Sequence, residues 1–282
     1  MSFFSERISR RACLRGAASI TLGGAAPGGR GLSGQAAGQP RTLALIGDRY
    51  HNADFIRVAL VRLFRELDLP IDFTINYEKI SARLLADYRL FICLRDGMIW
   101  PGGYLGPDAY PYTEDLENPE DWPETKPVGW ISEEQGSAIR DFVLNGNGFY
   151  AYHNSSHISL YSKAYRDVMG GAYIGHPPLR PFKVRVTNAD HPVTRGVRDF
   201  MVTDEQHYVT CDKDPRHIIL RSENVDGLRY ENYGTQAIAG WAYDYGKGRV
   251  VFTAPGHTLH ALWQPEYLKI QQNAVRWLLR IL

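Results

Sequence analysis

Short apolar runs alternate with longer amphipathic segments along most of this 282-residue chain. Short apolar runs bounded by turn residues are typical of buried strands, and an apolar stripe repeating every three to four residues is typical of helices. The pattern predicts strands at residues 42–47, 71–75, 90–94 and 149–152, with helices at 54–67, 81–86, 132–144 and 162–169. Strands that alternate with helices indicate a parallel α/β sheet flanked by helices.

Local signals support two of these helices. Ser132 and Gln135 have the spacing of a capping box, and Asn145-Gly146 is a typical helix end. In the helix at 54–67, the stripe predicted to face the core consists of Phe55, Val58, Ala59, Leu63 and Phe64.

The strand signals become shorter after Gly175. They lie at residues 182–186, 218–222, 237–242 and 249–253. The last two are joined by a glycine-containing turn and are typical of a hairpin. A helix is predicted at 265–282. We therefore expect an antiparallel extension in the C-terminal half, with residues 42–282 forming one domain.

The first 37 residues differ in composition from the rest of the chain. Arg10-Arg11, with Leu14 shortly after and a weakly apolar Gly/Ala-rich run at 16–26, resembles a twin-arginine export signal. The run is too short to span a membrane as a helix. We therefore expect residues 1–37 to direct the protein to the periplasm or to secretion. The alternative is a basic tail with no role in export.

Charge and cysteine content narrow the class of protein. Removal of residues 1–37 takes away five arginines and one glutamate, which lowers the formal net charge from +1 to −3. The remaining chain has no basic stripe, so nucleic acid is not an expected partner. Cys93 lies in an apolar run and is expected in the core, while the sequence leaves open both its pairing with Cys211 and the oligomeric state.

Histidines follow three of the predicted strands at the point where each strand ends. They are His51 with Asn52 after the first strand, His153 with Asn154 after the fourth, and His257 after the last. Open α/β sheets bind ligands beyond the carboxyl ends of their strands, so we expect these side chains to share one pocket. Asn52 also fits the N-cap position of the helix at 54–67.

The segment from Asp96 to Trp130 matches neither the helix nor the strand pattern and is rich in proline, glycine and aromatic residues. A loop of this length is usually functional or disordered, and disordered segments are poor in aromatic residues. We expect an ordered lid in which Asp96, Trp100 and Tyr104 contact a sugar. The alternative is that these aromatic residues only cover the edge of the sheet.

Several short motifs occur in an order that resembles one known family. They are Gly148-Phe-Tyr-Ala-Tyr-His153, Gly175-His-Pro177, Asp190-His-Pro-Val-Thr-Arg-Gly196, Thr203-Asp-Glu205, Trp241 with Tyr245-Gly-Lys-Gly-Arg-Val250, and Gly256-His257. From residue 42 to 282 the chain resembles the trehalose-utilisation (ThuA-like) family. The resemblance implies a flavodoxin-like fold related to class I glutamine amidotransferases. It also implies a role in carbohydrate metabolism, with oxidised (3-keto) sugars and glycosides as candidate substrates.

Amidotransferase relatives carry a nucleophilic cysteine on the turn after the strand that corresponds to residues 149–152. This chain has His153 on that turn, and neither Cys93 nor Cys211 is placed to supply a thiolate. Glutamine hydrolysis by cysteine is therefore not expected. Ser155 and Ser156 lack the glycines of a nucleophile elbow, which disfavours serine hydrolase chemistry.

The polar residues of the motifs indicate the chemistry. We expect His153 and Glu205 to form an acid–base pair, with His257 positioning the substrate and Asp204 contacting it. A carbonyl at C3 of a sugar acidifies the neighbouring C–H group. One acid and one base can then drive elimination, hydration or isomerisation of a keto-sugar.

Two alternatives remain open. One is a divalent-metal hydrolase with His51, His153 and His257 as ligands, and that metal is the one candidate cofactor. The other is a non-catalytic module that binds a sugar or a partner protein through the aromatic loop. His176 fits a functional and a structural role equally, and His191 is expected to be structural.

Overall fold

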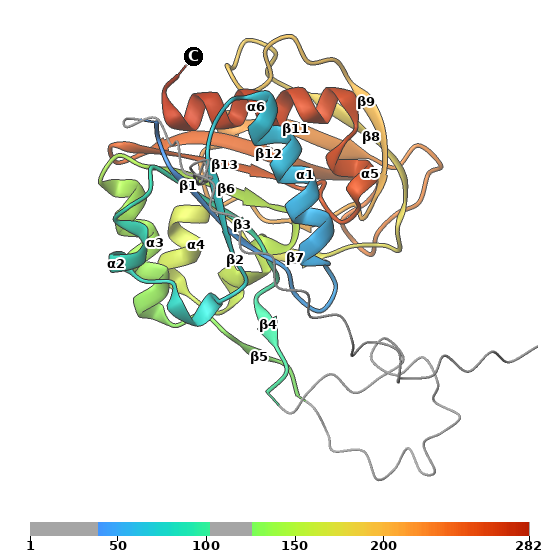
Figure 1. Ribbon diagram of the computed structural model, residues 1–282. Helices are drawn as coiled ribbons and strands as arrows, with labels where there is room; N and C mark the ends of the chain where they lie inside the picture. Colours follow the sequence, from blue (N-terminus) through green and yellow to red (C-terminus); the bar gives the residue numbers. More distant parts are fainter. Residues whose placement is uncertain (1–38, 102–125, 282) are drawn as a thin grey trace, which may run out of the picture. The chain divides into compact units, whose positions relative to one another are not determined.

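The computed structural model describes residues 39–101 and 126–281. Nine strands of this part of the chain form one mixed sheet (Figure 1). In spatial order they are β2 (Ile71–Thr74), β1 (Thr42–Ile46), β3 (Leu90–Leu94), β6 (Gly148–Tyr152), β13 (Gly248–Thr253), β12 (Gln236–Tyr245), β11 (Ile218–Glu223), β8 (Arg180–Val186) and β9 (Phe200–Asp204). The first five are mutually parallel, and the rest continue the sheet antiparallel. The predicted fold class is confirmed.

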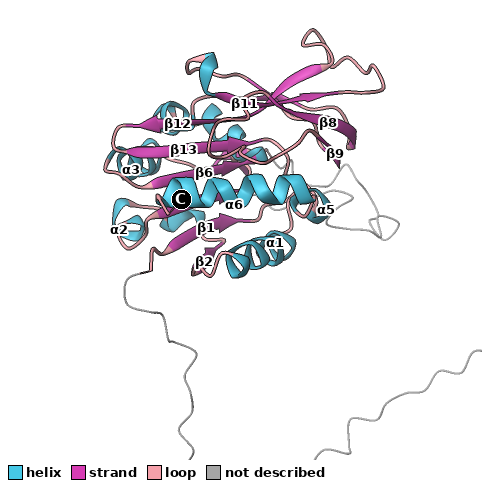
Figure 2. Ribbon diagram, turned by 90° about the horizontal axis from the view of Figure 1, so that it is seen from above, coloured by secondary structure: helices cyan, strands magenta, loops and turns pink. Residues whose placement is uncertain are grey.

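Helices cover both faces of the parallel strands (Figures 1 and 2). One face carries α1 (Ala53–Glu66), α5 (Leu259–Leu262) and α6 (Pro265–Leu279), and the other carries α2 (Ala82–Leu85), α3 (Glu133–Leu144) and α4 (Lys163–Met169). Strands covered on both faces need apolar side chains at every position. Accordingly β1, β3 and β6 are buried along their whole length.

The helix caps predicted from the sequence are present, but the buried face of one helix was predicted wrongly. The Ser132–Gln135 capping box forms at the start of α3, and Asn52 caps α1 by accepting hydrogen bonds from the next helical N–H groups. The predicted stripe of α1 was wrong at Phe55, which is exposed. The residues that α1 buries are Ile56, Ala59, Leu60, Leu63 and Phe64. The helix therefore presents a face rotated by about one residue from the predicted one.

Strand β9 is absent from the strands predicted from the sequence. Phe200 and Val202 are buried and Met201 is exposed, so the two-residue alternation of a strand is present, but only over five residues. Asp204 is the last residue of β9. Two small two-stranded sheets were also not predicted: β4 (Met98–Ile99) with β5 (Val128–Gly129), and β7 (Tyr173–Gly175) with β10 (Tyr208–Val209).

Three further observations complete the fold. Cys93 is buried in the core, and it and Cys211 are both free thiols. Among residues 39–101 and 126–281, no helix has the length and apolar character needed to cross a membrane. The predicted export segment at 1–37 and Tyr104 lie outside the described residues.

Candidate functional site

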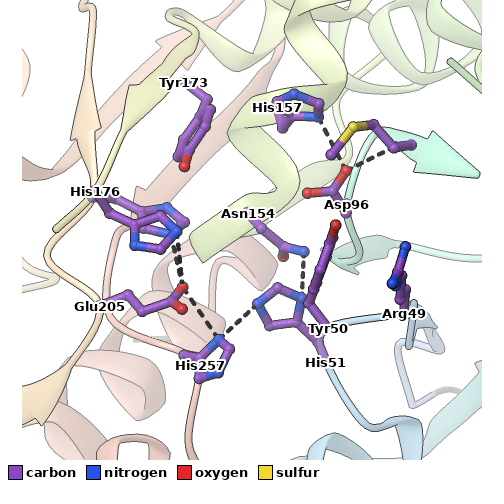
Figure 3. A pocket seen from close by; sticks show the side chains of 12 residues that line it. Arg49, Tyr50, His51, Asp96, Asn154, His157, Tyr173, His176, Glu205 and His257 are labelled. Carbon is purple, nitrogen blue, oxygen red and sulfur yellow. Dashed lines mark hydrogen bonds and ion pairs between the residues drawn. The ribbon is translucent and has the colours of Figure 1, made fainter. Parts of the chain in front are cut away.

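The carboxyl ends of the parallel strands open onto a pocket of about 620 Å³ (Figure 3). Loops after β1, β3, β6 and β13 line it, and segments beside β7, β9 and β10 complete the wall. Six of the nine histidines of the chain are gathered here: His51, His153, His157, His176, His207 and His257. The predicted meeting of histidines from distant parts of the sequence at this edge is therefore observed.

The turn from β6 into the 3₁₀ helix η4 (His153–Leu160) places His153 under the pocket. The backbone of His153 has a φ of 47°, in the left-handed region that non-glycine residues rarely adopt. Such strain costs about 1–3 kcal/mol and clusters at functional sites. Gly256 permits the close approach of the β13 loop, because a Cβ atom there would lie 2.9 Å from Cβ of His153.

Asp204, at the end of β9, fixes the loop that carries His257. Its Oδ2 atom accepts hydrogen bonds from the backbone N–H groups of Gly256 (2.6 Å) and His257 (3.2 Å). Asp204 is fully buried, and this burial raises the pKa of its carboxyl group above the usual value. Its observed role is to position the backbone of the site, although the sequence analysis expected it to contact substrate.

Asp48 orients His51. The carboxylate accepts hydrogen bonds from two backbone N–H groups of the turn and lies 2.9 Å from Nδ1 of His51. Burial alone would raise the pKa of Asp48, but the hydrogen bond and charge of His51 together with the backbone N–H groups of Asp96 and Tyr50 outweigh it and lower this pKa to about 2. Nδ2 of Asn154 lies 2.7 Å from the same Nδ1 atom but donates to Oδ2 of Asp48, so we assign the proton on Nδ1 of His51 to the hydrogen bond with the ionised carboxylate. Nε2 of His51 is left as a lone pair that faces Nδ1 of His257 at 3.1 Å.

A hydrogen bond to a backbone carbonyl fixes the tautomer of His153. Its Nδ1–H donates to the carbonyl oxygen of Ala254 at 2.6 Å. Its Nε2 atom lies 3.4 Å from Oε2 of Glu205 and has no hydrogen-bond partner among the described residues. The side chain is 0% exposed, and burial lowers its pKa, which favours the neutral ring.

Glu205 is the centre of the cluster. Its Oε2 atom lies 3.2 Å from Nδ1 of His257 and 3.5 Å from Nε2 of both His176 and His207, in addition to its contact with His153. Partial burial would raise the pKa of Glu205, but the surrounding histidines lower it far below the usual value, so the side chain is a carboxylate. Figure 3 shows this carboxylate between His176 and His257.

These contacts make the site suitable for a divalent cation. One ligand atom from each of His51, His153, Glu205 and His257 lies within 4.8 Å of all the others. Three imidazoles with one carboxylate are a ligand set typical of zinc and related metals, and metal-bound histidines usually donate their other N–H to a carboxylate or a carbonyl. His51 and His153 have such partners in Asp48 and in the carbonyl of Ala254.

The other predicted site residues have different positions. Asp96 and Asn154 line the pocket, and Asn154 donates to Oδ2 of Asp48 at 2.9 Å. Asn52 is not in the pocket lining and acts as the cap of α1. Trp100 packs edge to face against Tyr50, which does line the pocket, at 5.7 Å between ring centroids.

Three histidines of the pocket were not predicted as site residues from the sequence. Nδ1 of His157 lies 3.0 Å from Oδ1 of Asp96 on the wall opposite Glu205 (Figure 3), while His176 and His207 contact Glu205 itself. The position of His207 two residues after Glu205 was an available signal, but it depended on recognising β9 and β10. His191 has the expected structural role: its Nδ1 accepts from the backbone N–H of Val193.

The turn after β6 offers no nucleophile of the amidotransferase type. Burial raises the pKa of the Cys93 thiol to about 12, and neither Cys93 nor Cys211 lines the pocket. Ser155 and Ser156 are fully buried, and Ser156 donates to the backbone carbonyl of His153. Within the described residues, these side chains are not placed to attack a substrate in the pocket.

Comparison with solved structures finds the same fold in several proteins. A putative ThuA-like protein from Parabacteroides merdae has 16% identity and a TM-score of 0.61 over 86% of this chain and 90% of its own. One from Bacteroides uniformis has 17% identity and a TM-score of 0.59 over 88% and 95%. A cytoplasmic protein from Salmonella typhimurium has 12% identity and a TM-score of 0.53 over 84% and 99%.

Comparison by sequence gives a family but no individual relative. No curated protein matches the chain. A family model named ThuA and described as trehalose utilisation matches residues 122–278, which is more than half of the chain. This range includes the turn of His153 and the loops of Glu205 and His257. The chain therefore belongs to the ThuA, or trehalose-utilisation, family, as the order of its motifs suggested.

Proposed function

We propose that this protein is a divalent-metal-dependent enzyme that acts on a sugar derivative, with a 3-keto-sugar or 3-keto-glycoside as substrate. One observation carries the proposal. The lone pairs of His51 and His153 converge with the carboxylate of Glu205 on one small space. All of these atoms are hydrogen-bond acceptors, so they repel one another unless a positive charge lies between them.

Protons alone are a poor source of that charge. A proton on Nδ1 of His257 can serve Nε2 of His51 or Oε2 of Glu205, but the lone pair of His153 still faces the carboxylate. Charging several imidazoles would place several positive charges next to one another in a buried site, which is costly. A single divalent cation satisfies all the acceptors at once.

This arrangement changes the roles expected for His153 and Glu205. His153 is 0% exposed and does not line the pocket, so it is better suited to holding a cation than to exchanging protons with a substrate. The pair His157–Asp96 lies on the opposite wall and is open to the pocket. We therefore assign acid–base chemistry to His157, oriented by Asp96 at 3.0 Å.

The pocket suits a polar ring of sugar size. Its volume of about 620 Å³ is in the range of small-molecule sites. Tyr50 and Tyr173 provide aromatic surface, and the hydroxyl of Tyr173 points into the pocket (Figure 3). When bound, a divalent cation acts as a Lewis acid that polarises a carbonyl or hydroxyl oxygen. A ketone with a neighbouring hydroxyl presents two oxygens for such a site, which favours a keto-sugar.

The test combines metal analysis with a substrate panel. The chain purified without chelator is expected to contain divalent metal and to convert 3-keto-glycosides, but not the parent glycosides. His153→Ala is expected to lose both the metal and the activity, whereas His260→Ala, which alters an exposed histidine outside the pocket, is expected to keep both. A fully active chain without bound metal would contradict the proposal. Saturable sugar binding without product would instead indicate a binding module.

We also propose that residues 1–37 direct export, on the basis of the Arg10-Arg11 pair and the weakly apolar run after it. Changing both arginines to lysine is expected to retain the protein in the cytoplasm, as measured by cell fractionation. Unchanged export of that variant would contradict this part of the proposal.

A further inference from the structure

A second group of metal-type ligands adjoins the first. His176, Glu205 and His207 each offer one ligand atom, and these atoms lie within 4.8 Å of one another. Both histidines line the pocket. Glu205 is common to both groups, so its carboxylate lies between two sets of imidazoles.

The small β7–β10 sheet creates this second group. Gly175 of β7 pairs with Tyr208 of β10 in antiparallel register. The residue after Gly175 and the residue before Tyr208 are therefore opposite each other, and these are His176 and His207. Their rings stack with centroids 5.2 Å apart and an interplanar angle of 20°. The pairing of the two histidines is thus fixed by backbone register.

The tautomer of His176 matches that of a metal ligand. Its Nδ1–H donates to the carbonyl oxygen of Pro177 at 2.8 Å, which leaves Nε2 as a lone pair 3.5 Å from Oε2 of Glu205. His207 is 2% exposed, and its Nε2 atom lies 3.5 Å from the same oxygen. Nε2 of His176 therefore faces the carboxylate of Glu205 as a lone pair. Nε2 of His153 faces the same carboxylate in the same way.

We propose a second divalent-cation site, in which His176 and His207 are ligands and Glu205 bridges this cation to the first one. Two histidines and one carboxylate leave coordination positions open toward the pocket, where substrate oxygens can bind. Paired metal ions of this kind hold two oxygens of one substrate, which suits a keto-sugar with adjacent oxygens. The inference rests on the proposed function, because it adds a second cation to the first.

The test measures how many cations the full-length chain holds. Chelator-stripped protein is reloaded with Mn²⁺, and bound metal is counted by equilibrium dialysis and by atomic emission. The wild-type chain is expected to bind two Mn²⁺ ions, and His176→Ala is expected to bind one. His176 is partly exposed and its replacement should leave the fold intact, which circular dichroism checks. His207→Gln provides a second variant, and His260→Ala is the matched control expected to bind two.

Electron paramagnetic resonance supplies a readout that does not depend on activity. Two Mn²⁺ ions bridged by one carboxylate are expected to give a spin-coupled spectrum, and His176→Ala is expected to give the spectrum of an isolated ion. Wild-type protein that binds one ion, with no change in either variant, would overturn the second site and leave the proposed function standing. Wild-type protein that binds no ion would overturn both.

Discussion

Two clusters of buried polar side chains lie close together in this protein and differ in whether their polar atoms find hydrogen-bond partners within the protein. The first is the histidine pocket around Glu205. The second, the tyrosine cluster, is built from Tyr150, Tyr152, Thr253 and Tyr267. The hydroxyl of Thr253 lies 2.7 Å from that of Tyr267 and 3.2 Å from that of Tyr150, and Tyr267 donates to the carbonyl of Pro255 at 2.7 Å.

A hydroxyl group both donates and accepts, and each of these three hydroxyls has a hydrogen-bond partner: Thr253 donates to Tyr150, and Tyr267 donates to the carbonyl of Pro255. The tyrosine cluster is therefore satisfied by the protein alone, and its role is structural. In the histidine pocket the fixed tautomers of His153 and His176 leave an Nε2 lone pair on each ring that faces the carboxylate of Glu205. Buried polar groups are normally paired, so an unpaired set points to a missing positive partner. The difference supports the proposal that the histidine pocket binds a cation, whereas the tyrosine cluster is structural.

The largest expected effect comes from Glu205→Gln, which removes the charge that the histidines surround. Bound metal and turnover are both expected to fall by about 100-fold or more, since changes to partners of metal ligands already cost 10–100-fold. Metal analysis and steady-state kinetics measure this. Removing metal by chelator should lower the melting temperature of the wild-type chain but not of the variant. Equal metal content in the wild-type chain and in Glu205→Gln would contradict the view that the histidine pocket, unlike the tyrosine cluster, needs a cation.

The next effect concerns the orientation of His51. Asp48→Asn replaces a carboxylate, which can only accept a hydrogen bond from Nδ1–H of His51, with a neutral amide that no longer fixes this tautomer. Metal affinity is expected to fall by about 10–100-fold with the fold preserved. Competition with a fluorescent chelator gives the dissociation constant. An unchanged constant would show that Asp48 has only a structural role in its turn.

A change in the tyrosine cluster is expected to act on stability alone. Tyr267→Phe leaves the carbonyl of Pro255 without a hydrogen-bond donor and removes one of the two partners of the Thr253 hydroxyl, so it should lower the free energy of unfolding by about 1–3 kcal/mol. Metal content should not change. Tyr152→Phe is the matched control, because the hydrogen bond of its hydroxyl to Gln271 is long, at 3.4 Å. Loss of metal in Tyr267→Phe would mean that the two clusters are coupled.

The smallest effect is expected at Glu266, where a third polar cluster lies near the surface. Its carboxylate accepts from Lys269 (2.8 Å) and from the backbone N–H of Arg198 (3.0 Å). The hydrogen bond from Lys269, followed by that from Arg198, lowers the pKa of Glu266 to about 2. Glu266→Gln should therefore cost less than about 1 kcal/mol at neutral pH.

The pH dependence of this cost has a definite sign. The pKa of Glu266 is lower in the folded chain than in the unfolded chain, where it is about 4.3. The stabilisation is present above that value and is lost as the pH falls toward about 2. Urea unfolding of both chains at pH 7 and pH 3 measures this. A larger difference at pH 3 would contradict the assignment.

The parallel half of the fold was predictable because each element carries its own local signal. The apolar runs of β1, β3 and β6, and the capping box of α3, are complete within a few residues. β9 was missed because five residues with one buried face give too weak a pattern. That error also left Asp204 and Glu205 without a position, although their side chains hold the backbone of His257 and the centre of the site.

The sequence by itself determined the family motifs, the strand ends and the histidines that follow them, since these depend on residues close together in the chain. Only the tertiary structure decided what the histidines do. The tautomers of His153 and His176 depend on carbonyl groups, and the carboxylate that both rings face comes from a third segment. Hydrogen-bond partners of this kind are set by the packing of distant strands, which no local pattern of residues records.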